Sequence, residues 1–410
     1  MSTTRTGTAP EQKVTKRSGN VASFKDSLSA IDTYGNEYKA PTYGINDVLK
    51  AIPKECFQRR LTTSFYYVFR DIAVVASMMY VANTFIPLIS NVYLRGIGWT
   101  AYAITLSLPY TGLWVLAHEC GHQAFSDYGW VNDSVGWVLH SYLMVPFFSW
   151  KFTHGRHHKA TGNLAKDTVF LPRTKQEFIN MHGATSLNDV VSDTPAYALY
   201  HLILQQFGGW WAHLFTNVTG QKFEGQTTFN VNHFKPSAPI FESKEYWYVV
   251  LSDVGILSML TVTYFWYQTF GGFNLFINWF LPYVFCNHWL VFITFLQHTD
   301  PVLPHYEASA WSFSRGAACT IDREFGFVGT FFLHDIIETH VLHHFVSRIP
   351  FYNARPASEA IKPVLGDSYK HSDENMWVSL WKSARTCQFV DGDEMKMFRN
   401  VNGYGVKPTA

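Results

Sequence analysis

Three short stretches decide how this chain folds: His118-Glu-Cys-Gly-His122, His154-Gly-Arg-His-His158 and His340-Val-Leu-His-His344. They hold eight of the eighteen histidines of the chain in fifteen residues. Within each stretch the histidines are three or four positions apart, so on a helix their imidazoles share one face. One such pair is common by chance. Three clusters in one chain predict a metal site, and the fold must bring them together.

The composition indicates a protein divided between a membrane and water. Charged residues make up 15% of the chain and aromatic residues 17%, whereas about a quarter of a soluble protein is charged. The mean hydropathy is nevertheless close to zero. A net charge of +1 gives no sign of a nucleic-acid partner. The five cysteines include no CxxC pair, which argues against a disulfide framework or a zinc knuckle.

The chain before the first apolar segment has two parts, a polar tail and an amphipathic stretch. Residues 1–44 are rich in Ser, Thr, Lys and Gly and predict a disordered cytosolic tail rather than a signal peptide. Residues 45–70 are amphipathic and include Arg59 and Arg60. We expect this stretch to lie at the membrane interface on the cytosolic side, because basic residues flank the first span there.

Four apolar segments are each close to the length of about 20 residues that crosses a bilayer. They are residues 72–89, 96–117, 246–270 and 273–295. Very short links pair them as two transmembrane hairpins, 71–117 and 246–297. The predicted fold is therefore an all-α integral membrane protein with four transmembrane helices and a cytosolic helical cap that holds the histidines.

The histidine clusters test this topology. If both hairpins enter from one side, segment 118–245 (cytosolic or interfacial) and the cytosolic region 298–410 face the same compartment, and all three clusters lie together. A further apolar run, residues 135–152, separates the first two clusters. It is interrupted by His140, Pro146 and Ser149, and we expect it to lie against the membrane, since a crossing would separate these clusters.

The number of imidazoles argues for two metal ions. Neutral imidazole binds Zn, Cu, Fe and Ni, but one tetrahedral zinc uses only four ligands. Iron is the metal whose oxygen chemistry suits a dinuclear site. His298, at the polar end of the fourth span, is a ninth candidate, and Thr294 one turn earlier could hold a bridging water. His288 lies about 15 Å deeper along the helix and is rejected as a ligand.

The remaining polar candidates are less specific. Glu119, Asp167, Asp335 and Glu338 could orient imidazoles, and each could equally be a solvated charge. His334 is off the ligand face of a helix continuous with His340. Seven histidines stand alone and are not expected to be ligands: His140, His182, His201, His213, His233, His305 and His371.

The first stretch also matches H-E-x-x-H, in which two histidines bind zinc and the Glu is the base of a metalloprotease. At a membrane boundary this pattern would suggest an intramembrane zinc protease. A protease needs only one further ligand, which leaves at least five clustered histidines unexplained. The oxygen-dependent metal site is the better interpretation.

Further stretches extend the pattern. They are Leu116-Ala-His-Glu-Cys-Gly-His-Gln-Ala-Phe-Ser126, His157-His-Lys-Ala-Thr-Gly-Asn163, Leu296-Gln-His-Thr-Asp-Pro301, Cys319-Thr-Ile-Asp-Arg323, Glu338-Thr-His-Val-Leu-His-His344 and Ile349-Pro-Phe-Tyr-Asn-Ala354. With them the chain resembles the membrane fatty acid desaturases and their hydroxylase relatives over residues 32–385. It is most similar to the fungal acyl-lipid Δ12 (oleate) desaturases. The motifs are specific to the superfamily, but they say much less about which carbons of the acyl chain are oxidised.

The resemblance implies a di-iron site that uses O2. The implied ligands are the eight clustered histidines and His298, that is His118, His122, His154, His157, His158, His298, His340, His343 and His344. Electrons would come from reduced cytochrome b5 and its NADH-dependent reductase. The chain has no His-Pro-Gly-Gly motif of a fused cytochrome b5 domain, so the donor should be a separate protein. The family resides in the endoplasmic reticulum membrane.

The expected reaction is Δ12 desaturation of an oleoyl chain to a linoleoyl chain, with acyl-lipid or acyl-CoA as substrate. An unactivated methylene has no acidity or leaving group, so acid–base chemistry cannot react with it, whereas metal-activated O2 can. An oleate 12-hydroxylase, an ω3/Δ15 or bifunctional Δ12/Δ15 desaturase and a Δ12 acetylenase remain open, as does a homo-oligomer. A non-enzymatic metal-binding membrane scaffold is the alternative from another class.

Overall fold

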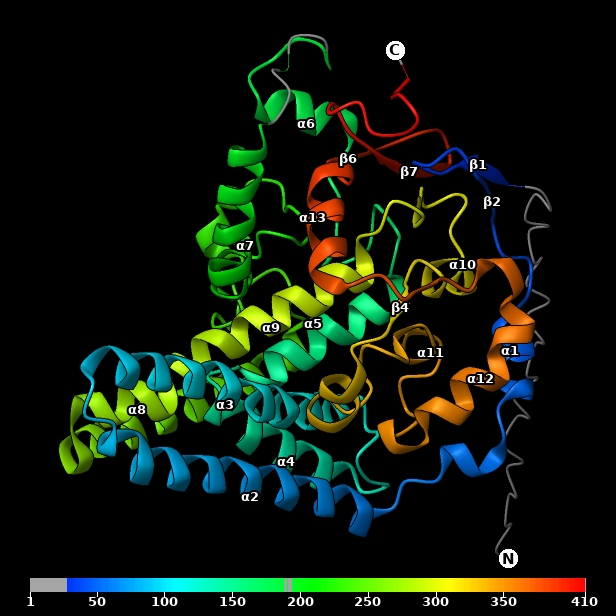
Figure 1. Cartoon of the computed structure of the whole chain (residues 1–410). Coiled ribbons are helices and arrows are strands. Elements are labelled where there is room, and N and C mark those ends of the chain that lie inside the picture. The colour runs from blue at the N-terminus through cyan, green and yellow to red at the C-terminus, as the bar shows by residue number, and fades with distance from the viewer. Residues whose placement is uncertain (1–27, 188–189, 191–193, 410) are drawn as a thin grey trace, which may run out of the picture.

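The computed structural model describes residues 28–187, 190 and 194–409, and this part of the chain is mostly helical. Its α-helices are α1 (Ile45–Ala51), α2 (Leu61–Phe85), α3 (Val92–Gly121), α4 (Gly129–Tyr142), α5 (Phe147–Ala160), α6 (Lys175–Met181), α7 (Pro195–Thr216), α8 (Tyr246–Leu275), α9 (Leu281–His298), α10 (Phe313–Ala317), α11 (His340–Phe345), α12 (Ala354–Leu365) and α13 (Met376–Thr386). Figure 1 shows α2, α3 and α8 extending to one side of a cap built mainly from the C-terminal third.

The cap also contains short strands, so the prediction of an all-α protein needs correction. The strands are β1 (Ser29–Ile31), β2 (Glu37–Lys39), β3 (Pro304–Tyr306), β4 (Asp322–Arg323), β5 (His371–Ser372), β6 (Phe389–Asp391) and β7 (Met395–Arg399). They form the sheets β1-β2, β3-β7-β6 and β4-β5, of which only β4-β5 is parallel.

The predicted disordered tail ends too late in the sequence. Strands β1 and β2 form a hairpin within it, and buried Tyr38 packs with Tyr306 and Met397 of the cap. Aromatic burial therefore orders residues that the polar composition assigned to the tail. The rest of the predicted tail, residues 1–27, lies outside the described residues.

Two helical segments are long and apolar enough to cross a membrane, Leu61–Leu88 and Ser243–His298. In their most apolar stretches only 17% and 22% of the residues are buried. A core helix of a soluble protein would be mostly buried, so these segments favour a membrane. The second comprises α8, a π-helical turn (Phe276–Phe280) and α9, with a kink at Gly271, whose φ of +81° suits glycine.

Helix α3 has 30 residues and contains Pro109, but it is not apolar enough for the same criterion. From Tyr102 to Cys120 it is largely buried among the other helices. It contacts α4, α9 and α2. The second of the predicted spans is therefore a full-length helix, while length and apolarity do not establish the predicted count of four spans.

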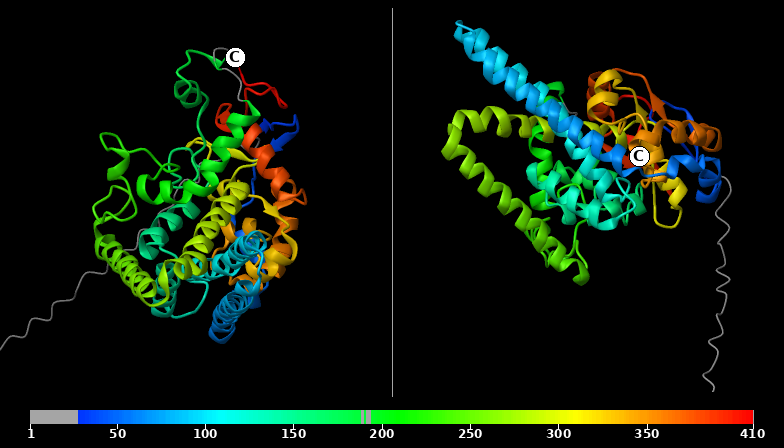
Figure 2. Two further views of the ribbon diagram at one scale, coloured as in Figure 1. Left: turned by 60° about the vertical axis from the view of Figure 1, so that its left-hand side comes forward. Right: turned by 90° about the horizontal axis from the view of Figure 1, so that it is seen from below.

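Helices α8 and α9 diverge from their turn, as the right-hand view of Figure 2 shows. Helices α4 and α5 pack against α8, whereas α3 and α7 pack against α9. The apolar run 135–152 thus forms no single span. It is divided between α4 and α5 by a turn in which Met144 has a φ of +55° and Pro146 precedes α5.

Backbone carbonyl oxygens in and beside the π-helical turn accept hydrogen bonds from side chains inside the helix bundle. The Tyr110 hydroxyl donates to the Asn278 carbonyl oxygen at 2.7 Å, and the Asn278 amide donates to the Asn274 carbonyl oxygen at 3.1 Å. Tyr102 donates to the Asn278 side-chain oxygen at 2.6 Å. These contacts satisfy backbone groups that lipid could not and fix the start of α9 against α3.

Candidate metal centre

Four helices meet at the histidines. His118 and His122 lie at the end of α3, and His154, His157 and His158 lie on α5. His298 is the last residue of α9, and the third cluster occupies the whole of α11. The helical spacing of each cluster directs its imidazoles to one side, so the packing of α3, α5, α9 and α11 places them in a common space.

The donor atoms form two groups. His118, His122, His154, His158 and His343 each offer a ring nitrogen, and these nitrogens lie within 4.8 Å of one another. His157, His298 and His344 form the second group by the same measure.

His340 adjoins the second group. Its Nε2 lies 3.0 Å from Nε2 of His298, and its ring centroid is 4.5 Å from that of His344. The two groups touch where the rings of His158 and His344 stack 4.1 Å apart. The structure therefore brings together all nine residues predicted from the sequence, as one cluster with two centres.

The surroundings of five clustered imidazoles favour their neutral form. Burial lowers the pKa values of His154, His158, His340, His343 and His344 well below that of a free histidine, and neighbouring imidazoles lower them further. Neutral imidazole is the form that binds a metal ion. The environment thus keeps ring nitrogens ready to donate lone pairs at neutral pH.

Several of these nitrogens are buried without a hydrogen-bond partner. Within the described residues this is true of Nε2 of His122, His157, His343 and His344. An unpaired buried polar atom destabilises a protein by about 1–3 kcal/mol. A cluster of such nitrogens that converge on two points fits a pair of metal ions, which would satisfy them.

Contacts around the cluster fix individual rings. Nδ1 of His157 donates to Asp167 Oδ1 at 2.7 Å, and the Thr161 hydroxyl lies 3.0 Å from Nδ1 of His344. Asp167 is the one predicted orienting carboxylate that hydrogen-bonds a clustered imidazole. Such bonds set the tautomer and orientation of a ligand ring.

The other three predicted carboxylates have different partners. Glu119 accepts from the Phe351 backbone N–H at 3.0 Å, and Glu338 accepts from the Phe325 backbone N–H at 3.2 Å. Asp335 pairs with Arg355 at 2.7 Å. None of the three hydrogen-bonds a clustered imidazole, although Glu119 Oε1 lies 3.7 Å from Nδ1 of His118. Because the Glu119 carboxylate is bound to backbone and His118 and His122 belong to a five-imidazole group, the protease interpretation also loses its geometric basis.

The third cluster was expected on a longer helix. Residues before His340 form turns instead, because His334 and Asp335 have φ values of +56° and +59°. His334 turns away to bond Asp71 of α2 at 2.8 Å. Asp322 replaces the missing turn by accepting the Val341 backbone N–H at 2.7 Å, near the start of α11.

Sequence reasoning missed the residues that hold α9 and its terminal histidine. Phe170 stacks on His298 at 4.5 Å. Arg323 is fully buried, and it donates to the Leu296 carbonyl oxygen at 3.0 Å and to Asp300 at 2.6 Å. Asp322 and Arg323 belong to the stretch Cys319-Thr-Ile-Asp-Arg323 that supported the resemblance, but the sequence alone did not indicate which groups they bind. The Thr294 hydroxyl donates to the Leu290 carbonyl oxygen of its own helix at 2.7 Å, and its role beside a bridging water stays a prediction.

The isolated histidines remain outside both groups. His288 stacks on Phe207 at 5.0 Å, and His140 packs between Trp114 and Trp150. His213 and His233 have Thr219 and Thr153, respectively, as partners at 3.2 Å. Within the described residues the metal-binding candidates are thus those of the cluster alone.

A cavity of about 1180 Å³ leads to the cluster. Its walls are α6, α7, the end of α9, the segment 164–174 and parts of the C-terminal region. His298 and Phe170 line its inner end, while Leu202, Gly208 and Ala212 belong to the α7 wall. An apolar chain inside this cavity would reach the second histidine group.

The chain matches known proteins over most of its length. The sequence model of the family described as fatty acid desaturase matches residues 97–374, more than half of the chain. An oleate hydroxylase of Claviceps purpurea is 44% identical, covering 94% of this chain and 87% of its own.

Two Δ12 fatty acid desaturases give similar matches. The enzyme of Mortierella alpina is 38% identical over 88% of this chain and 92% of its own. That of Arabidopsis thaliana is 39% identical over 90% of this chain and 92% of its own. The resemblance predicted from the motifs is confirmed, and with it a membrane protein and an oxidoreductase: the chain belongs to the fatty acid desaturase family.

Proposed function

We propose that this protein is an acyl-lipid Δ12 desaturase, which converts oleoyl to linoleoyl chains with O2 and electrons from cytochrome b5. The observation that carries the proposal is the nine-histidine cluster at the inner end of the cavity beside α7, which we call the α7 cavity. Relatives that desaturate fatty acids at Δ12 or hydroxylate oleate supply the substrate class of the proposal.

The cluster would hold two iron ions. His118, His122, His154, His158 and His343 would bind one, and His157, His298, His340 and His344 the other. When bound, reduced iron supplies the activation of O2 that removes hydrogen from an unactivated methylene. In balance, two substrate hydrogens, two electrons and two protons reduce one O2 to two waters, and the carbons gain a double bond.

The residues of the chain prepare this chemistry without acting as acids or nucleophiles. Burial lowers the pKa values of His154, His158, His340, His343 and His344, Asp167 and Thr161 orient two rings, and Phe170 shields His298 on one side. The aromatic residues Trp114 and Trp150 pack on His118 and exclude water from the first group. Exclusion of water protects a strong oxidant from side reactions.

The membrane arrangement follows from the same requirement. We propose four spans as two hairpins, α2–α3 and α8–α9, with both termini cytosolic and the protein in the endoplasmic reticulum membrane. All nine histidines then lie on the cytosolic side, where cytochrome b5 and its reductase would deliver electrons. The burial of α3 by neighbouring helices supports its place as a span despite its polar residues.

Hydroxylation of oleate at carbon 12 is the second candidate. It is favoured by the identity of 44% to the Claviceps purpurea oleate hydroxylase, against 38% to the Mortierella alpina desaturase. The same oxidant can add a hydroxyl group in place of removing the second hydrogen. An ω3/Δ15 desaturase, a bifunctional Δ12/Δ15 desaturase and a Δ12 acetylenase would use the same histidine ligands, so they stay open as alternatives.

The deciding experiment is a fatty acid profile of budding yeast expressing the chain, by gas chromatography–mass spectrometry. This host makes oleate but no polyunsaturated acids and supplies its own cytochrome b5. We expect a 9,12-diene; a 12-hydroxy product would select the hydroxylase. A His343→Ala variant expressed at the same level should make neither. If wild-type protein with bound iron changes no lipid even when linoleate is fed, the metal-binding scaffold would be the better assignment.

A further inference from the structure

Helix α7 carries no charged side chain in its 22 residues. At 100° per residue its side chains divide into three faces. One face, with Ala198, Leu202, Gln206 and Gly209, is turned toward α9; Leu202 packs with Trp289 and Phe292 of that helix. Interior packing accounts for this face but not for the other two.

The outer face of α7 consists of Leu199, Tyr200, Ile203, Leu204 and Phe207. These five large apolar residues are between 38% and 59% exposed. Single exposed apolar residues are normal on a protein surface, whereas a contiguous patch on one helix marks an interaction site. Since none of the five is charged, the patch fits an apolar environment.

The third face lines the α7 cavity. It contains Tyr197, His201, Gln205, Gly208 and Ala212. Gly208 lies in the middle of the helix, where glycine is unfavourable by roughly 1 kcal/mol relative to alanine. No packing requires it, because a Cβ atom there would meet nothing within 4 Å. Its effect is to leave the cavity wide at this point.

Helix α7 lies across the α8–α9 segment rather than along it, as Figure 1 shows. Trp211 donates to the Tyr283 hydroxyl at 2.9 Å, and Gly209 approaches Val291 closely. Both partners lie on α9 before His298. From Tyr283 to His298 a helix rises about 22 Å. If α9 crosses the bilayer, α7 therefore packs across the membrane-embedded part of α9, on the side of His298.

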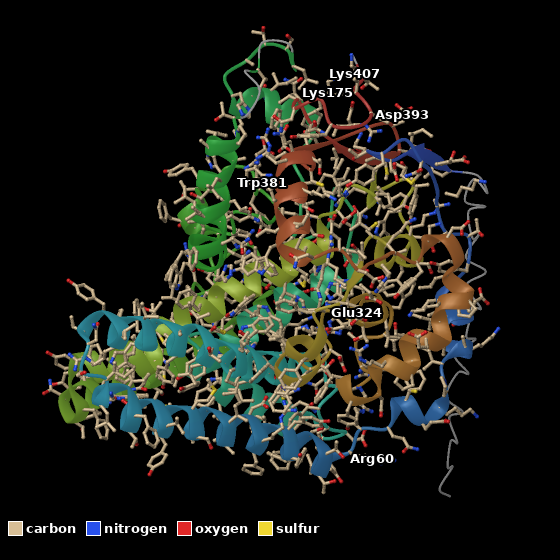
Figure 3. All side chains as sticks on the ribbon, viewed as in Figure 1. Arg60, Lys175, Glu324, Trp381, Asp393 and Lys407 are labelled. Atoms are coloured by element: carbon tan, nitrogen blue, oxygen red, sulfur yellow. The ribbon has the colours of Figure 1, made fainter. Side chains whose placement is uncertain are left out.

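The outer face continues onto α13. The ring of His288 lies 5.0 Å from Phe207 and 6.0 Å from Trp377, so it joins the two helices. Trp377 and Val378 are about half exposed, and Figure 3 labels Trp381 between α13 and α7. Tryptophan is enriched where a membrane meets water. The apolar surface is therefore continuous over two helices.

We propose that the outer face of α7, with the Trp377–Val378 edge of α13, is immersed in the lipid leaflet on the side of the histidine cluster. The occupant of this surface is lipid, because the surface is uncharged and α7 lies against α9, which belongs to an apolar membrane segment. An in-plane helix buries its apolar face to about 5–10 Å in the boundary between headgroups and acyl chains.

One consequence rests on the proposed function. Since Leu204 borders both the outer face and the cavity, the cavity opens beside the immersed helix. A lipid acyl chain then enters sideways from the leaflet, passes Gly208 and reaches His298, without leaving the membrane. Helix α7 acts as the wall between the leaflet and the entry path.

Immersion is tested on the full iron-loaded chain in phosphatidylcholine nanodiscs. A fluorophore is attached at Ile203→Cys, with Leu257→Cys on α8 as lipid reference and Asp393→Cys as water reference, in a Cys387→Ser background. The other four cysteines are buried. Asp393 is labelled in Figure 3 near the C-terminal end of the cap.

We expect a lipid carrying an acyl-chain nitroxide to quench the Ile203 label at least half as strongly as the Leu257 label, with iodide quenching only the Asp393 label. Quenching of the Ile203 label by iodide to the level of the Asp393 label would refute immersion. Protection from both quenchers would also overturn it, since a second copy or another protein would then cover the helix.

The entry path is tested separately with Gly208→Trp, whose Cβ atom has open space and whose ring would narrow the cavity, and with Leu199→Trp as a matched control on the outer face. We expect at least a tenfold loss of turnover for the first variant and less than a twofold change for the second, both with unchanged iron content. Full activity of Gly208→Trp would overturn the path and leave immersion intact. An inactive wild type would refute the proposed function, while the quenching result still decides immersion.

Discussion

At the scale of single residues, the cluster depends on groups that bind no metal themselves. Asp167 is buried, and it accepts from His157 and from the backbone N–H groups of Gly162 and Val169. It therefore connects the ring orientation of one proposed ligand to the loop that follows α5. The sequence indicates Asp167 by its position shortly after the second cluster, but it equally indicated Asp335, whose partner Arg355 lies twenty residues away.

We expect Asp167→Asn to lower iron affinity or activity by roughly 10–100-fold, the usual effect of losing a carboxylate that orients a ligand histidine. An amide oxygen is uncharged and accepts the imidazole N–H more weakly than a carboxylate does, so the tautomer and orientation of His157 are held less firmly. Iron per protein, measured by elemental analysis after dialysis, reports the effect. Asp335→Asn is the matched control and should keep both ions; equal iron loss in the two variants would contradict a specific role for Asp167.

At the scale of elements, sequence periodicity predicted the helices that carry all three clusters, but it placed the start of the third helix too early. Spacing alone cannot show that His334 and Asp335 adopt left-handed φ values, because their partners Asp71 and Arg355 come from distant segments. Helix α7 was also missed. Its lack of charge is visible in the sequence, but its exposed face is defined only by where α9 and the cavity lie.

The end of α9 gives the second prediction. Arg323 is fully buried and holds both the Leu296 carbonyl oxygen and Asp300 beside His298. Removing one partner of a buried ion pair typically destabilises a protein by about 3–5 kcal/mol. We expect Arg323→Met to lower the thermal unfolding midpoint and to release iron from the second group first. Arg355→Met removes a pair whose arginine side chain is 44% exposed and which, like surface pairs, is expected to contribute only about 0–1 kcal/mol; a loss of stability as large as that of Arg323→Met would argue against this reasoning.

At the scale of the whole molecule, metal binding and folding should be coupled. Residues of α3, α5 and α11 contribute unpaired, buried imidazole nitrogens to one space, to which α9 adds His298. A ligand that binds only the folded state adds about 2.7 kcal/mol of stability at one hundred times its dissociation constant. We expect iron to raise the unfolding midpoint of purified protein in nanodiscs, and a strong chelator to reverse the rise. An unfolding midpoint that is independent of iron would separate the cluster from the stability of the fold.

The order of the histidines along the chain sets a time at which the centre can first exist. His122 is made early and His340 late, and at a synthesis rate of about 5–20 residues per second the interval is on the order of ten seconds or more. During that interval α3 and α5 display imidazoles that have no partners. Metal delivery to the finished site is therefore a post-translational event, and any chain interrupted before α11 leaves the ribosome with an incomplete set of ligands.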